Sequence, residues 1–104
     1  MKRFLTSLVA LAVTATAASV AHAADKLTLQ LQWVTQAQFA GYYVALDKGY
    51  YKEEGLDVTI KPGGPDIAPP QVLAGGGADL MLNWMPSALA EREKGVPVVN
   101  IAQP

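Results

Sequence analysis

The chain contains 104 residues, has a formal net charge of −1 at pH 7 and lacks cysteine. This charge, with no Lys/Arg cluster beyond the N-terminus, argues against a nucleic-acid-binding surface. A chain without cysteines cannot be a small disulfide-stapled scaffold, so an ordinary apolar core must stabilise it.

The N-terminus has the pattern of a secretory signal peptide. Two positive residues precede residues 4–20, which are uncharged and rich in Leu, Val and Ala, and Ala21-His22-Ala23 fits a small-x-small cleavage site. The alternative is a membrane anchor, but the apolar run is short for one. We predict that residues 1–23 are a cleaved signal peptide, and that residues 24–104 lie in the periplasm without His22, the only histidine.

The first half of the mature part predicts a β-α-β unit. Leu27 to Trp33 alternates apolar and polar residues, which is typical of a strand. From Phe39 to Lys48 the apolar positions follow helical spacing, and Gly49 suits the end of that helix. A polar corner over residues 50–55 leads into a second alternating strand, Leu56 to Ile60.

The second half predicts two further helices and strands. Residues 61–70 hold four prolines and two glycines, which predicts a loop. A short helix is possible at residues 67–73, at the end of this loop, with Asp66 as a possible N-cap. Apolar residues 78–84 predict a buried parallel strand. A helix follows at 86–94, and a fourth strand is predicted at 97–102.

The order β-α-β-α-β-α-β predicts an α/β fold, a mostly parallel sheet with helices on both faces and right-handed crossovers. Ligands of such sheets bind beside the carboxyl ends of the strands. The chain stops directly after the fourth predicted strand, so we expect residues 24–104 to be a fragment of a longer protein.

Two predicted strand-to-helix junctions place aromatic and neutral polar side chains at this ligand-binding edge. Each has an ordinary alternative: a core tryptophan, a solvated loop glutamine or a serine at the start of a helix. Of the adjacent Tyr42 and Tyr43, we expect one to pack and the other to face the crevice. The candidates are Trp33, Tyr42 and Trp84 for stacking, and Gln38, Asn83 and Ser87 for polar contacts.

No pattern indicates catalysis. The spacing of Gly75-Gly76-Gly77 fits no phosphate-binding fingerprint and favours a turn. The mature part has no cysteine or histidine and no cluster with metal-ligand spacing. We therefore expect a protein that is not an enzyme and needs neither metal nor cofactor.

The segment from Gly41 to Val58, GYYVALDKGYYKEEGLDV, resembles a signature of periplasmic binding proteins of ABC transporters that serve sulfonates, nitrate, taurine and thiamine precursors. Residues 76–79 and 88–99 match further segments of that pattern. The resemblance implies a monomeric, two-lobed, type II-like protein that captures a small molecule between its lobes and delivers it to a membrane permease. Residues 24–104 would be the truncated N-terminal part of this solute-binding domain.

The aromatic candidates resemble the branch that binds thiamine-precursor pyrimidines, which we favour over sulfonate, taurine or nitrate. A related enzyme, the eukaryotic thiamine-pyrimidine synthase, consumes its own histidine and binds pyridoxal phosphate through a lysine. The resemblance places that histidine at Ser87 and that lysine at Asn83, which disfavours the enzyme. A sensor domain attached to a membrane protein is a third alternative.

Overall fold

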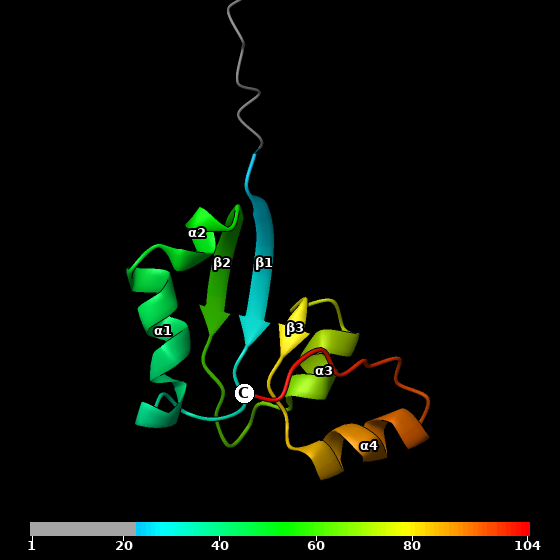
Figure 1. The fold of residues 1–104 in the computed structure, drawn as a ribbon. Helices are drawn as coiled ribbons and strands as arrows, with labels where there is room; N and C mark the ends of the chain where they lie inside the picture. Colours follow the sequence, from blue (N-terminus) through cyan, green and yellow to red (C-terminus); the bar gives the residue numbers. More distant parts are fainter. Residues whose placement is uncertain (1–22) are drawn as a thin grey trace, which may run out of the picture.

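The computed structural model describes residues 23–104, so all but the last residue of the predicted signal peptide lies outside the described part. Strands and helices alternate along the chain (Figure 1). The elements are β1 (Asp25–Gln30), the 3-10 helix η1 (Ala37–Phe39), α1 (Ala40–Asp47), α2 (Tyr50–Glu53), β2 (Leu56–Lys61), α3 (Pro69–Ala74), β3 (Leu80–Met81) and α4 (Met85–Glu93). Within the described residues, no helix is long and apolar enough to cross a bilayer.

The strands form a parallel sheet in the order β2-β1-β3. The register pairs Leu29 with Ile60 on one side and with Leu80 on the other. In Figure 1, α1 and α2 lie on the side of β2, whereas α3 and α4 lie on the side of β3. The α/β fold class is thereby confirmed, as a three-stranded parallel sheet flanked by helices.

The alternation in β1 gives the sheet one apolar face and one polar face. Leu27 and Leu29 are in register with Val58 and Ile60, so their side chains share a face. The core forms there from Leu29, Leu31 and Phe39, and partly buried residues of α1, β2 and β3 pack against it. Burial of this leucine face therefore holds α1 on the sheet.

The first and third strands are shorter than the sequence predicts. β1 ends at Gln30 rather than Trp33, although the Leu31 amide still donates to the Lys61 carbonyl at 2.8 Å. β3 has two residues, and single hydrogen bonds from Asp79 and Leu82 to β1 carbonyls extend its pairing at each end. Within residues 23–104, β3 pairs with β1 alone, so its pairing stops where β1 ends.

The fourth strand predicted at residues 97–102 is wrong: no strand forms there. The Val98 amide donates to the Val96 carbonyl at 2.8 Å, which closes a local turn rather than a ladder. The alternating Val99 and Ile101 are 76% and 73% exposed. In the described chain this segment has no strand beside it to satisfy its backbone groups, so alternation alone does not make it a strand.

Two local expectations also need correction. Asp66 is not the N-cap of α3, because the cap position is Ala68, directly before the two prolines that open the helix. The expected corner at residues 50–55 contains the short helix α2. Gly49, which separates α1 from α2, has a φ of 77°, a conformation that other residues rarely adopt.

Replacing Leu31 with alanine should lower the free energy of unfolding by about 2–5 kcal/mol, because Leu31 is 0% exposed and the change leaves a cavity. Urea titration followed by circular dichroism measures this loss. The matched control is Leu89→Ala, at an α4 residue that is 54% exposed, for which we expect a change within about 0.5 kcal/mol. Equal losses in both variants would contradict the placement of the core.

Candidate functional site

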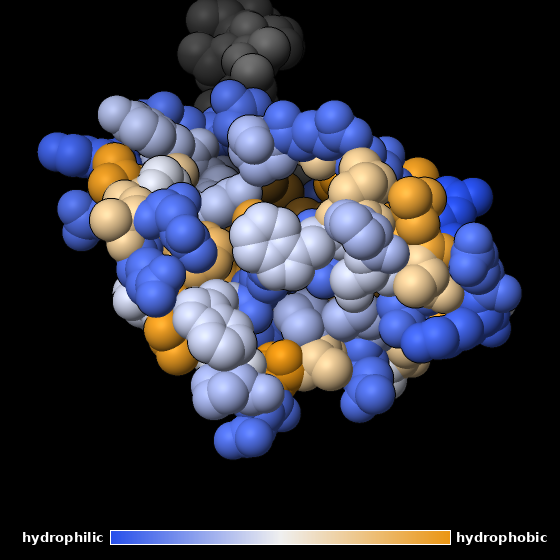
Figure 2. Space-filling model, turned by 90° about the horizontal axis from the view of Figure 1, so that it is seen from below, coloured by the Kyte–Doolittle hydropathy of each residue, from blue (hydrophilic) through white to orange (hydrophobic). Residues whose placement is uncertain are grey.

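The carboxyl ends of all three strands meet at one edge of the sheet because the strands are parallel. Figure 2 shows the molecule from this edge, with a hollow whose base is hydrophobic and whose surroundings are mostly polar or weakly polar. The loops that follow the strands, residues 31–36, 62–68 and 82–84, frame the edge. In α/β sheets this is where small ligands are held.

A cavity of about 1000 Å³ lies against the apolar face of the sheet and reaches this edge. Its base is aliphatic and includes Leu27, Leu29 and Val58. Its far wall is the extended segment 98–104, and α4 contributes a further side. At the strand ends the lining changes to aromatic and amide side chains: Gln32, Tyr42, Asn83 and Trp84. The cavity therefore has an aliphatic base and a group of aromatic and amide side chains beside the strand ends, and Asp79, Arg92, Asn100 and Gln103 add polar groups elsewhere in its lining.

Two tyrosines, Tyr42 of α1 and Tyr51 of α2, line the cavity on the side of β2. Tyr42 lines the cavity, and its carbonyl oxygen accepts a 3.3 Å hydrogen bond from the Tyr51 hydroxyl. Burial, with a smaller contribution from the neighbouring Tyr42, raises the pKa of Tyr51 above its ordinary value of 10.0. The Tyr43 hydroxyl instead lies 3.2 Å from the Thr35 hydroxyl, which joins α1 to the loop after β1. Of the two adjacent tyrosines, Tyr42 is thus the one at the cavity.

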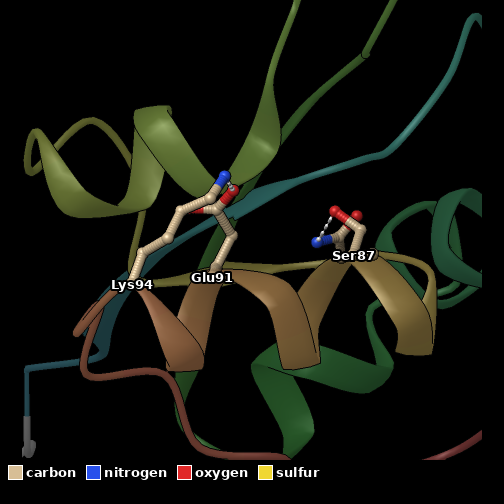
Figure 3. Close-up of polar contacts among 4 residues, drawn as sticks. Ser87, Glu91 and Lys94 are labelled. Carbon is tan, nitrogen blue, oxygen red and sulfur yellow. Dashed lines mark hydrogen bonds and ion pairs between the residues drawn. The ribbon is translucent and has the colours of Figure 1, made fainter.

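A hydrogen-bonded pair marks the junction between β3 and α4 (Figure 3). The Asn83 side-chain nitrogen donates to Ser87 Oγ at 3.0 Å, and the Asn83 side-chain oxygen accepts from the Trp84 amide at 3.0 Å. Asn83 therefore satisfies an amide at the helix start, whereas the cap position itself, Trp84, has no side-chain cap bond. Further along α4, Lys94 pairs with Glu91 at 3.2 Å.

The six residues selected from the sequence divide into two groups. Tyr42, Asn83 and Trp84 line the same cavity, although Trp84 is 68% exposed. Trp33 is 42% exposed beyond the end of β1 and is not part of the cavity wall. Gln38 is exposed in η1, and Ser87 is half-buried and contacts Asn83 rather than the cavity. The structure therefore brings three of the six residues together at the cavity.

Sequence reasoning missed Gln32, which lines the cavity beside Tyr42 and Asn83. If β1 continued to Trp33, the period-two alternation would place Gln32 on the polar face, away from the leucines. Because β1 ends at Gln30, the alternation no longer fixes the direction of this side chain. The available signal was a neutral amide two residues beyond the end of the strand.

The glycine-rich turn offers no anion site. The Gly75, Gly76 and Gly77 amides donate to the Gln71, Leu73 and Val72 carbonyls, respectively, at 2.9–3.1 Å. These bonds close the end of α3, so the three amides are used within the turn. Among residues 23–104, no group of three or more His, Cys, Asp or Glu side chains is placed to hold a metal ion.

Replacing Tyr51 with phenylalanine should change how stability depends on pH. A raised pKa means that the folded state holds the hydroxyl proton more tightly, so wild-type stability falls as pH rises above about 10. Below that pH, the free energy of unfolding of the variant should be about 1 kcal/mol lower than that of the wild type, because the hydrogen bond to the Tyr42 carbonyl is lost. Above that pH, the free energy of unfolding of the variant should fall less steeply.

Urea titrations between about pH 8 and pH 11 measure this difference. The matched control is Tyr50→Phe, because Tyr50 is the exposed neighbour on the same helix. Parallel stability curves for wild type and Tyr51→Phe across this range would contradict the assignment.

Comparison with known proteins identifies the family. A model of the family described as "NMT1/THI5 like" matches residues 36–104. The chain is 36% identical over 85 residues to a formylaminopyrimidine-binding protein of Halalkalibacterium halodurans, covering 82% of this chain and 26% of that protein. It is 35% identical over 80 residues to a 4-amino-5-hydroxymethyl-2-methylpyrimidine phosphate synthase of Saccharomyces cerevisiae, covering 75% of this chain and 23% of the synthase.

A third relative is a putative thiamine biosynthesis protein of Haemophilus influenzae, 29% identical over 80 residues that cover 76% of this chain and 25% of that protein. The chain thus spans about a quarter of the length of the curated relatives it matches. The family model covers more than half of the chain, and the identities extend over most of the described residues. The chain belongs to the NMT1/THI5-like family.

Proposed function

We propose that this chain is part of a periplasmic solute-binding protein of an ABC importer, and that its ligand is a thiamine-precursor pyrimidine or a similar heterocycle. The observation that carries the proposal is that two aromatic residues, Tyr42 and Trp84, and two amides, Gln32 and Asn83, line one cavity whose base is aliphatic. The relatives support the ligand class, because the names of the binding protein and of the synthase both refer to substituted pyrimidines.

The chemistry of these side chains suits an aminopyrimidine. Aromatic rings such as those of Tyr42 and Trp84 stack on planar heterocycles. A side-chain amide has both a donor and an acceptor, which complement an exocyclic amino group and a ring nitrogen. The Asn83 amide keeps one N–H and one lone pair free after its bonds to Ser87 and Trp84. The aromatic and amide side chains of the cavity therefore supply both stacking and paired hydrogen bonds.

The charged residues around the cavity do not favour a small anion. Arg92 lines the cavity, but its guanidinium donates to the Val98 carbonyl at 3.2 Å. Asp79 also lines it, and its carboxylate accepts the Thr28 amide at 2.7 Å. Neither charge belongs to the aromatic and amide end. Sulfonate, taurine and nitrate thus lack a cation at the position where a neutral heterocycle finds amides.

The transport role rests on the N-terminal pattern and on the binding-protein relative. A signal peptide would deliver the protein to the periplasm, where the ligand is captured beside the strand ends and passed to a membrane permease. Closure of a second lobe over the ligand would complete the contacts that one face of a single lobe lacks.

The rival function is that of a pyrimidine synthase, which the 35% identical yeast relative favours. The synthase resemblance requires a lysine at Asn83 and a histidine at Ser87, and the structure joins these two side chains by a 3.0 Å hydrogen bond. An amide nitrogen is not a nucleophilic amine, so Asn83 cannot form a Schiff base with pyridoxal phosphate. An absorbance band of bound pyridoxal phosphate in the purified full-length protein would support the synthase instead.

Thermal-shift titration of the full-length protein tests the ligand class. We expect 4-amino-5-hydroxymethyl-2-methylpyrimidine or formylaminopyrimidine to raise Tm, since a ligand at 100-fold excess over Kd stabilises by about 2.7 kcal/mol. Taurine, alkyl sulfonates and nitrate at the same concentration serve as comparison ligands. A shift with these anions alone would retain a transport role and refute the pyrimidine.

Alanine at Tyr42 or Trp84 should weaken pyrimidine binding by about ten-fold or more, because each variant removes a stacking surface of the cavity. Isothermal titration calorimetry measures Kd. The matched control is Val44→Ala, at an exposed residue of α1 outside the cavity wall, for which Kd should stay within about two-fold. Unchanged affinity in both the Tyr42 and the Trp84 variant would contradict the site.

Export predicts a specific N-terminus. Protein recovered from the periplasmic fraction should begin at Ala24 or Asp25, because Ala21-His22-Ala23 fits the cleavage pattern. Replacing Ala23 with leucine should leave the precursor uncleaved, since the cleavage site requires a small residue. Intact-mass measurement of both proteins distinguishes these forms, and a wild-type protein that retains Met1 in the cytoplasm would contradict export.

A further inference from the structure

We propose that Gly63 is a positioning residue for the ligand: it lets the loop after β2 lie directly against the backbone that carries Gln32 and Trp33. This inference rests on the proposed function, since it concerns the same end of the cavity. Gly63 does not itself line the cavity. It acts through its contact with residues 31–33, and Gln32 is the member of that stretch that reaches the cavity.

The contact at Gly63 leaves no room for a side chain. A Cβ atom on this residue would lie 2.6 Å from three backbone atoms: the Gln32 carbonyl carbon, the Leu31 oxygen and the Trp33 nitrogen. Backbone atoms cannot move aside as a flexible side chain can, so one of the two loops would have to shift. The Gly63 amide also donates to the Trp33 carbonyl at 3.0 Å. Glycine is therefore required here for close approach.

A buried glutamine holds the same two loops together. Gln30, the last residue of β1, is 3% exposed. Its side-chain nitrogen lies 2.9 Å from the Leu31 carbonyl oxygen, 3.1 Å from the Pro62 oxygen and 3.4 Å from the Lys61 oxygen. The amide thus bridges the chain after β1 to the chain after β2. Burying a polar group costs free energy unless it is bonded, so these contacts keep the loops in one arrangement.

This clamp lies where regular pairing stops. The β1–β2 ladder ends at Gln30 and Lys61, and beyond it the Leu31 and Gly63 amides make the remaining backbone bonds between the two loops. Without the Gly63 contact, Gln32 and Trp33 would stand on a loop joined to its neighbour only by the Leu31 amide and the Gln30 side chain. Ligand-binding groups need their supporting residues fixed within about 0.5 Å, so a displaced loop should cost affinity before it costs the fold.

The test compares two adjacent glycines in the full-length protein. Gly63→Ala introduces the backbone clash, whereas a Cβ at Gly64 would meet a single side-chain atom of Ile67 at an ordinary 3.9 Å. With 4-amino-5-hydroxymethyl-2-methylpyrimidine as the probe in calorimetry, we expect Gly63→Ala to raise Kd by about ten-fold or more. Gly64→Ala should change Kd by less than about two-fold.

A second readout needs no ligand. In protein labelled with fluorotryptophan, the Trp33 and Trp84 signals are assigned by their loss in Trp→Phe variants. Gly63→Ala should shift or split the Trp33 fluorine signal and leave that of Trp84 in place, whereas Gly64→Ala should change neither. A general loss of structure would instead move both signals, so the selective change distinguishes positioning from destabilisation.

The outcomes separate the two proposals. If the wild type does not bind the probe but the Trp33 signal responds selectively to Gly63→Ala, the ligand assignment fails, whereas the role of Gly63 in positioning residues 31–33 stands. If Gly63→Ala binds the probe as wild type does and the Trp33 signal is unchanged, the positioning role is overturned. If Gly63→Ala does not fold, the Gln30→Met variant replaces it, because this change removes the amide that bridges the two loops without adding a clash. The Kd for the probe and the Trp33 fluorine signal are then compared with those of the wild type in the same way.

Discussion

The central position of β1 is the constraint on which the rest of the structure depends. Both other strands pair with it and with nothing else in the described chain, so the ends of β1 set the ends of the sheet. Its leucines provide the surface that α1 covers, and its carboxyl end lies at the edge where aromatic and amide side chains line the cavity. A short central strand therefore determines both the core and the location of the site.

The sequence was most informative where local chemistry decides the structure. The helix expected at residues 86–94 forms as α4 at Met85–Glu93, because a proline opens it and Gly95, with φ of 90°, follows its end. Alternation was less informative, since it reports which face a residue would take only if a neighbouring strand is present. Residues 97–102 alternate without a partner, and Gln32 lies beyond the last ladder pair, so neither outcome follows from spacing alone.

The candidate site illustrates the same limit. Tyr42, Asn83 and Trp84 reach the cavity because helix starts and strand ends at this edge have a fixed geometry. The backbone at Trp33 also lies against Gly63, 30 residues further along, in a contact that no local pattern encodes. The family includes relatives named as a binding protein and as synthases.

The two hydrogen bonds of Asn83 have a consequence for selectivity between related heterocycles. Rotating its amide by half a turn would set oxygen against oxygen at Ser87, unless that hydroxyl turned to donate, and nitrogen against nitrogen at the Trp84 amide. The amide is therefore held in one of its two orientations before any ligand arrives. A fixed amide presents its remaining donor and acceptor in a set order. Under the proposed function, the start of α4 would therefore distinguish a ring that carries an amino substituent from one that carries an oxo substituent at the same position.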